Sequence, residues 1–191
     1  MATLKQPHMT MAADLYTLPS DGHRYELIHG VLQMMSPSGA RHGRIAAQLA
    51  HLLKTHVDSG QLGIVFAAET GFLIQTEPDT VLAPDVAFVS RANYETIEND
   101  TQYIPLAPEF VAEVLSPSDR YGRVEAKALL WLEAGTKLVI VVDPENEPVH
   151  AYWSKKRIEV FERTETIDCN DAVASWTLVV DDIFRMPGLG R

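Results

Sequence analysis

The sequence of 191 residues contains a single cysteine, Cys169. One cysteine excludes an intrachain disulfide and a zinc site built from several cysteines, and this scarcity is typical of proteins in reducing compartments. Long apolar runs are also missing, since a stretch such as Leu138–Val142 is far too short to cross a bilayer. The first residues lack the apolar core of a signal peptide. These absences predict a soluble, cytoplasmic protein.

Basic residues are scarce, with 16 lysines and arginines against 26 acidic residues and a net charge of −10. Proteins that bind duplex DNA tightly usually carry a basic surface, so this charge argues against an extended DNA-binding face. It does not exclude a local basic patch, and a bound divalent cation would offset part of the negative charge. Arg41, Arg44, Arg120 and Arg123 bring positive charge to two predicted helix starts, where they either contact phosphates or stay solvated.

The motifs of several enzyme classes are absent. There is no phosphate-binding loop, no glycine-rich dinucleotide fingerprint and no G-x-S-x-G nucleophile elbow, which excludes kinase and dehydrogenase functions. The composition, 46% hydrophobic and 22% charged, is that of an ordinary globular protein. Together with the length, it predicts a single domain over 1–191 with its core at about 22–184.

The apolar periodicity predicts a mixed α/β fold around one central sheet flanked by helices. Arg24–Ile28 and Val31–Met35 form a predicted N-terminal hairpin, separated by His29 and Gly30. Helices are expected at 10–18, 41–57, near 93–97 and at 120–134, the last closed by Gly135. Further strands are expected at 62–67, 70–75, 84–89, 110–115, 138–142, 149–153, 157–161 and 176–180.

Two carboxylates stand inside apolar runs that are typical of central strands. Asp85 precedes the run 86–89, and Glu113 follows the run 110–112. Ionised carboxylates are seldom left in such surroundings unless positive charge meets them. If the two strands are antiparallel neighbours, both acids lie at the same rim of the sheet. This arrangement predicts a metal site, and the alternative for Asp85 is a solvated carboxylate at a strand end.

A lysine on the helix 120–134 is predicted to point toward these acids. The apolar positions of this helix, at i, i+4, i+7 and i+11, are Val124, Ala128, Trp131 and Gly135. Lys127 lies within this stripe and therefore faces the sheet, either as a catalytic group or as a lysine that snorkels to solvent. His42, at the head of the helix 41–57, is either a second contact for the acid rim or a hydrogen-bonded histidine at a helix end.

Several short blocks recur in one order along the chain and carry a family resemblance. They are Tyr25-Glu26-Leu27-Ile28-His29-Gly30, Met35-Ser36-Pro37-Ser38, Arg41-His42, Ala83-Pro84-Asp85, Glu113-Val114-Leu115-Ser116-Pro117-Ser118, Lys127, Glu133-Ala134-Gly135 and Val142-Asp143-Pro144. Together they resemble the Uma-type restriction endonuclease-like family, formerly a domain of unknown function within the PD-(D/E)XK nuclease superfamily. The resemblance covers about residues 10–185.

The resemblance implies a restriction-endonuclease-like fold in which Asp85 and Glu113 bind Mg²⁺, with Mn²⁺ as a substitute. The main-chain carbonyl of Val114 would complete the protein ligands. The superfamily lysine normally follows the second acid by two residues, but that position is Leu115 here. The family takes its lysine from the next helix, which matches the inward-facing lysine predicted above. By the same resemblance Glu26 joins the acidic cluster, the alternative being an exposed strand carboxylate.

These features predict a Mg²⁺-dependent endonuclease that hydrolyses phosphodiester bonds in DNA. A second hypothesis is a noncatalytic binding or assembly protein that retains the fold, which the charge of −10 favours. A third is hydrolysis of a smaller phosphodiester. A homodimer is also predicted, because double-strand cleavage by this fold class usually needs two active sites. The apolar segments 149–153 and 176–180 would either form its interface or complete the core.

Overall fold

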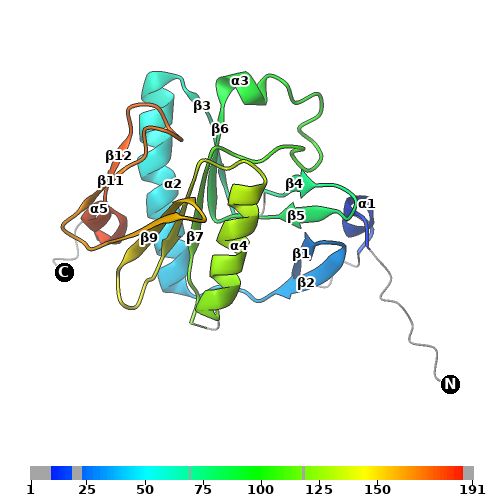
Figure 1. Ribbon diagram of the computed structural model, residues 1–191, viewed down its shortest axis with the longest axis horizontal. Helices are drawn as coiled ribbons and strands as arrows, with labels where there is room; N and C mark the ends of the chain where they lie inside the picture. The colour runs from blue at the N-terminus through cyan, green and yellow to red at the C-terminus, as the bar shows by residue number, and fades with distance from the viewer. Residues whose placement is uncertain (1–9, 19–22, 69, 118, 187–191) are drawn as a thin grey trace.

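The N-terminal part of the chain forms a short helix and a hairpin. The computed structural model describes residues 10–18, 23–68, 70–117 and 119–186. Pro19 and the turn-forming residues 20–22, which are expected to end the first helix, lie outside these ranges. Helix α1 (Ala12–Leu15) is followed by β1 (Arg24–Ile28) and β2 (Val31–Met35), which pair antiparallel as the predicted hairpin (Figure 1). His29 and Gly30 both have positive φ, at 49° and 74°. Positive φ at both central residues is the geometry of tight two-residue hairpins.

The centre of the molecule is a six-stranded mixed sheet in the order β10-β9-β8-β7-β6-β3. Its strands are β3 (Gly63–Ala67), β6 (Val86–Ser90), β7 (Phe110–Val114), β8 (Leu138–Val142), β9 (Val149–Ser154) and β10 (Arg157–Phe161). Only β7 and β8 pair in parallel among these neighbours, because α4 (Tyr121–Glu133) connects them as a crossover. The predicted mixed α/β fold is therefore confirmed.

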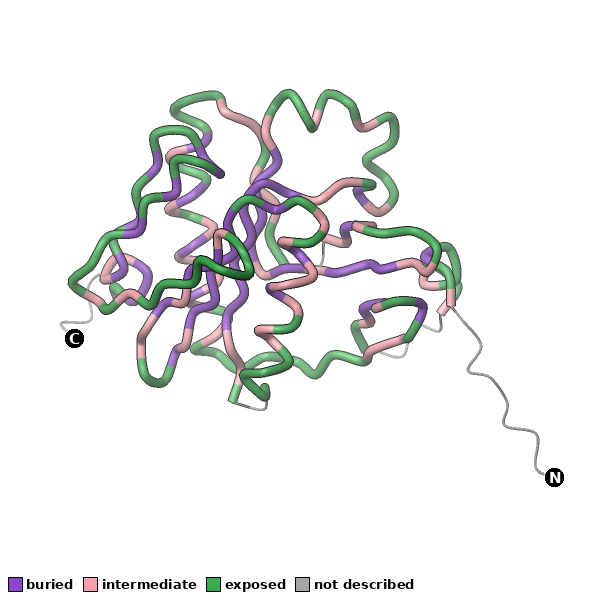
Figure 2. Tube along the Cα trace, viewed as in Figure 1, coloured by how far each residue is buried: buried purple, intermediate pink, exposed green. Residues whose placement is uncertain are grey.

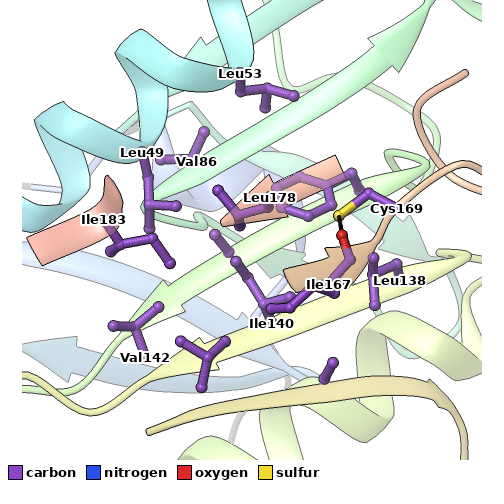
Figure 3. Packing of buried hydrophobic residues seen from close by; sticks show 14 of the residues in the cluster. Leu49, Leu53, Val86, Leu138, Ile140, Val142, Ile167, Cys169, Leu178 and Ile183 are labelled. Carbon is purple, nitrogen blue, oxygen red and sulfur yellow. Dashed lines mark hydrogen bonds between the residues drawn. The ribbon is translucent and has the colours of Figure 1, made fainter. Parts of the chain in front are cut away.

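Helices cover both faces of this sheet. Helix α2 (Ala40–Gly60) packs on one face and α4 on the other (Figure 1), and the strands between them are the most continuously buried part of the chain (Figure 2). Side chains alternate across each strand, so Ala112 and Val114 pack toward α2, while Val111 packs toward α4. Figure 3 shows Leu49 and Leu53 of α2 over Val86 and neighbouring core residues.

The structure contains two smaller sheets that the periodicity did not predict. The first has the order β2-β1-β5-β4, where β4 is Phe72–Gln75 and β5 is Thr80–Leu82. The second pairs β11 (Thr166–Asp168) with β12 (Thr177–Val179). Strands of three residues are too short to show a period of two, so these elements depend on pairing with distant segments.

Two helices also differ from the predictions. Helix α3 is Arg91–Tyr94, earlier than the helix expected near 93–97, because Ser90 caps it by accepting a hydrogen bond from the Asn93 amide. The strand predicted over 176–180 was wrong at its end, since Val180 begins the helix α5 (Val180–Phe184). Gly135 follows α4 with φ at +110°, as expected for the residue that closes a helix.

The later apolar segments complete the core. Val149, Ala151 and Tyr152 of β9 are fully buried, and Trp176 and Leu178 are at most 5% exposed. Of the two alternatives for these segments, the structure therefore supports packing within the chain. The homodimer stays a prediction. No helix in the described part of the chain has the length and hydropathy needed to span a membrane.

Candidate functional site

Asp85 and Glu113 lie side by side at one end of the central sheet. Strands β6 and β7 are antiparallel, and Val86 is the partner of Ala112, so the next pair in this register is Asp85 and Glu113. The strand expected over 84–89 begins at Val86, so Asp85 precedes β6 by one residue. This offset frees its carboxylate to accept a hydrogen bond from the Val114 amide at 2.8 Å. The prediction that both acids reach one rim of the sheet is confirmed.

Lys127 projects from α4 onto these acids. Its Nζ lies 3.0 Å from Oε1 and 3.1 Å from Oε2 of Glu113, and it donates to the Ala83 carbonyl at 3.3 Å. The side chain is 12% exposed. The ammonium group is thus held inside the site and does not reach out to solvent, so the snorkelling alternative is wrong. The helical stripe predicted the direction of this side chain correctly.

Glu26 reaches the same ammonium group from the other sheet. Its Oε1 lies 2.8 Å from Lys127 Nζ and accepts a hydrogen bond from the Ala83 amide at 2.9 Å. The side chain is 5% exposed, which excludes the exposed-carboxylate alternative. Strand β1 brings it here because Leu27 pairs with Val81 of β5, two residues before Ala83. The second sheet therefore positions the third acid.

Trp131 fixes the position of the Glu113 carboxylate by a hydrogen bond. Its indole Nε1 donates to Glu113 Oε1 at 2.9 Å, and its ring packs edge-on against Phe72. The side chain is fully buried. The sequence marked Trp131 only as part of the apolar stripe. Its position four residues after Lys127 on the same helix face was the available signal, because residues at this spacing share one side of a helix.

His42 contacts Asp85 from the opposite side of the sheet. Its Nε2 lies 3.1 Å from Asp85 Oδ2, while no group in the described ranges bonds its buried Nδ1. Burial lowers the pKa of His42, but the hydrogen bond to Asp85 and the negative charges of Asp85, Asp119 and Glu113 together outweigh it, so the pKa is raised above its ordinary value. His42 is therefore a hydrogen-bonded histidine in the first turn of α2, and the group that it contacts is an acid of the rim, so both alternatives for this residue fit. Both polar contacts of Asp85 within the described residues fall on Oδ2, which leaves Oδ1 for a ligand.

The cluster carries more negative than positive charge. Burial raises the pKa of Glu113 to about 7, against the lowering effect of Lys127, and the charges of Asp85 and Glu26 raise it further. Burial lowers the pKa of Lys127, but the two neighbouring glutamates outweigh this effect and raise the pKa well above its usual range. Lys127 is therefore protonated at neutral pH, while Glu113 is close to half protonated.

The residues fit a metal site that solvent and substrate would complete. No group of three or more histidine, cysteine, aspartate or glutamate side chains in the described residues is arranged to hold a metal ion. The predicted ligands are two carboxylates and one carbonyl. Mg²⁺ is commonly held by one or two carboxylates together with water and substrate phosphate, so this smaller set is sufficient.

A cavity of about 470 Å³ lies beside the acids. It is bounded by the first turn of α2, the segment that follows β7 and the first residue of α4. His42 lines it and connects it to Asp85, and Tyr121 forms part of the opposite wall. Its volume is within the range of small-molecule binding pockets. The site therefore has an adjoining space in which part of a substrate would fit.

Comparison with known proteins assigns this arrangement to a family. Residues 12–181 match the Uma2 family, which is described as "Putative restriction endonuclease". The chain belongs to the Uma2 family. No curated protein matches the chain. A solved structure, described as "a putative nuclease belonging to DUF820 from Anabaena variabilis ATCC 29413", shares its fold, with a TM-score of 0.76 and 20% identity over 91% of this chain and 97% of that chain.

Membership of the Uma2 family confirms the resemblance and the restriction-endonuclease-like fold. It also gives the coarse function, that of a nuclease family. One polar network of this Uma2 protein was missed by sequence reasoning. Tyr121 Oη lies 2.7 Å from His150 Nδ1 and 2.8 Å from Tyr152 Oη, which ties the start of α4 to β9. No local pattern predicted it, because the three residues come from two elements that meet only in the fold.

Proposed function

We propose that the chain is a Mg²⁺-dependent endonuclease that hydrolyses phosphodiester bonds in DNA. The observation that carries this proposal is the gathering of three carboxylates beside one protonated lysine and a cavity. Glu26 and Glu113 contact Lys127, while Asp85 lies next to Glu113, raises its pKa and contacts His42. A structural ion pair needs only one acid for one base, so the excess of carboxylates favours a site that takes a cation.

Asp85, Glu113 and the Val114 carbonyl would hold the metal. Mg²⁺ bound there supplies polarisation of a phosphate oxygen and lowers the pKa of a coordinated water. The hydrogen bond from the Val114 amide and the contact with His42 orient the Asp85 carboxylate so that Oδ1 faces the ligand. The hydrogen bond from the Trp131 indole orients the Glu113 carboxylate in the same way. These contacts keep the ligand atoms in place without further rearrangement.

Lys127 acts as a cation in this proposal. Its raised pKa keeps it protonated, so it does not take a proton from the attacking water at neutral pH. It instead donates hydrogen bonds that orient the water and offset the charge developing on the phosphate oxygens. Glu26 helps to hold the ammonium group in this position, with its Oε1 2.8 Å from Nζ. In this proposal the lysine therefore orients the attacking water and does not deprotonate it.

The direct test combines cleavage with metal binding. We expect the purified protein to cut plasmid DNA in the presence of Mg²⁺ or Mn²⁺, and calorimetry to detect Mn²⁺ binding that Asp85→Ala abolishes. Asp171→Ala, at an exposed aspartate, is the matched control and should bind Mn²⁺ as the wild type does. Single-stranded DNA and a dinucleotide substrate separate DNA cleavage from hydrolysis of a smaller phosphodiester. An inert protein with no Mn²⁺ binding would refute the proposal.

Metal binding should depend on pH through Glu113. Because its pKa is about 7, Glu113 is mainly protonated below pH 7 and must lose this proton to act as a ligand. The Mn²⁺ affinity should therefore fall by about tenfold for each pH unit below 7 and level off above it. Calorimetric titrations between pH 5.5 and 8.5 measure this slope. Glu113→Gln cannot lose a proton, and a slope that persists in this variant would rule out the assignment.

The noncatalytic alternative is favoured by one observation. Both oxygens of Glu113 already have partners, in Lys127 and Trp131, as expected for a buried structural network. A binding or assembly protein that retains the fold would keep these contacts and bind no metal. The Mn²⁺ titration distinguishes the two functions, since the network alone provides no reason for affinity that depends on Asp85.

A further inference from the structure

Helix α4 carries a row of basic residues that ends at the site. Arg120, Arg123 and Lys127 follow one another at spacings of three and four, so they lie on one side of the helix, with Arg120 at its N-cap. The innermost, Lys127, faces the acids. Each step along the row covers about one helical turn, or about 5.4 Å. The row thus leads from the exposed start of α4 to the lysine in the site.

Carboxylates neutralise many of the other basic side chains but not these two arginines. Basic residues with a carboxylate partner in the described part of the chain are Lys54, Lys127, Lys155, Arg157, Arg163 and Arg185. Arg120 and Arg123 are exposed, and neither has a carboxylate within 4.0 Å among the described residues. In a protein with a net charge of −10, these two arginines place unpaired positive charge next to the site, while Arg91, Lys137 and Lys156 are unpaired elsewhere among the described residues.

The cavity is lined by the start of α2 and by Asp119 and Tyr121, the neighbours of Arg120 in the sequence. Arg41 lines the far wall, where its guanidinium donates to the Pro144 carbonyl at 3.2 Å and has no carboxylate partner in the described ranges. Three acids also line the wall, Asp119, Asp143 and Glu145. Asp119 accepts a hydrogen bond from the Ser116 amide, and Asp143 accepts from the amide of Glu145 and both nitrogens of Asn146. These acids keep their negative charge, so an anion here would be bound by Arg41 in the wall and by the two arginines at the start of α4.

We propose that the sugar-phosphate backbone of a DNA strand lies along this row. Arg123 and Arg120 contact the phosphates that follow the one placed at Lys127, and Arg41 holds the strand from the opposite wall of the cavity. The inference rests on the proposed nuclease function, whose substrate it positions. Contacts of this kind fix the register of a strand without reading its sequence. They also explain how a protein with a negative net charge binds a polyanion, because the arginines that contact the phosphates lie together at one place on the surface.

The experiment measures DNA binding apart from cleavage. Fluorescence anisotropy with a labelled oligonucleotide, in EDTA and again with Ca²⁺, compares the wild type with Arg120→Ala, Arg123→Ala and the double variant. Each single change should weaken binding about tenfold, whatever the DNA sequence. Each should also reduce the slope of log K against log salt by about 0.7 to 0.9, the effect of one lost phosphate contact. Arg44 is left intact because it donates to the Phe184 carbonyl.

Two matched controls remove the same charge elsewhere. Arg91 on α3 and Lys156 in the turn between β9 and β10 are exposed and lack a carboxylate partner in the described residues. Arg91→Ala and Lys156→Ala should leave both affinity and salt slope unchanged. If the wild type binds no DNA, or if the controls lose as much affinity as the row variants, the inference is overturned.

The two proposals fail in distinguishable ways. Binding that depends on Arg120 and Arg123 without metal-dependent cleavage would overturn the nuclease function and support the row as a DNA contact. Metal-dependent cleavage with unchanged affinity in the double variant would support the nuclease function and overturn the row. Thermal melting of each variant checks that the fold is retained, which we expect because both arginines are exposed.

Discussion

Lys127→Met is expected to reduce DNA cleavage by about 10²–10³-fold, the loss typical of removing one group that stabilises transition-state charge. Methionine keeps the length of the side chain but neither orients water nor carries charge. The Lys127 ammonium contacts Glu26, Glu113 and the Ala83 carbonyl, and no other basic side chain among the described residues contacts either glutamate. The effect should therefore appear in kcat for the cleavage reaction.

The same substitution should destabilise the fold. Removing one partner of a buried ion pair leaves uncompensated charge and typically costs about 3–5 kcal/mol of unfolding free energy. The loss should be smaller at acidic pH, because Glu113, whose pKa is already about 7, becomes neutral there and no longer needs a counter-charge. Denaturant unfolding at pH 5.5 and pH 8 measures this difference.

The matched control is a lysine that, unlike Lys127, has no carboxylate partner in the described part of the chain. Lys137→Met removes an exposed lysine just before β8 and should change neither cleavage nor stability by a measurable amount. Full activity in Lys127→Met, measured on folded protein, would contradict the proposed role. An equal stability loss at both pH values would contradict the electrostatic account of it.

Trp131→Ala has the largest expected effect on packing. The indole is fully buried against Phe72 and the neighbouring core, and its removal should cost about 3–5 kcal/mol of unfolding free energy. Trp131→Phe restores most of the volume but lacks the N–H that donates to Glu113. This hydrogen bond lowers the pKa of Glu113, so its loss should raise that pKa above about 7 and move the Mn²⁺-binding profile to higher pH.

Trp176→Phe separates the two effects of Trp131. Trp176 is 5% exposed and packs against Phe110 in the cluster on the α2 face, away from Glu113. Its replacement by phenylalanine should destabilise the protein by a comparable amount without moving the pH profile of metal binding. If the pH profile of Mn²⁺ binding shifts equally in Trp131→Phe and Trp176→Phe, the loss of stability causes the shift, and the loss of the hydrogen bond to Glu113 does not.

The sequence predicted the central part of the site because that part depends on local patterns. Apolar runs with an acid at one end placed Asp85 and Glu113 at strand ends, and antiparallel pairing of neighbouring strands then put them at one rim. The helical stripe determined which way Lys127 points. Each inference needed only the direction of a side chain relative to its own strand or helix, which the periods of 2 and 3.6 residues specify.

The tertiary structure alone decided which distant elements meet at that rim. Periodicity identifies the face that an element buries but not the element that covers it, so the second sheet and its three-residue strand β5 were not predicted. The family resemblance supplied Glu26, but its contact with Lys127 depends on that sheet. The bonds of Trp131 to Glu113 and of His42 to Asp85, and the cavity between α2 and α4, likewise exist only because segments far apart in sequence pack together.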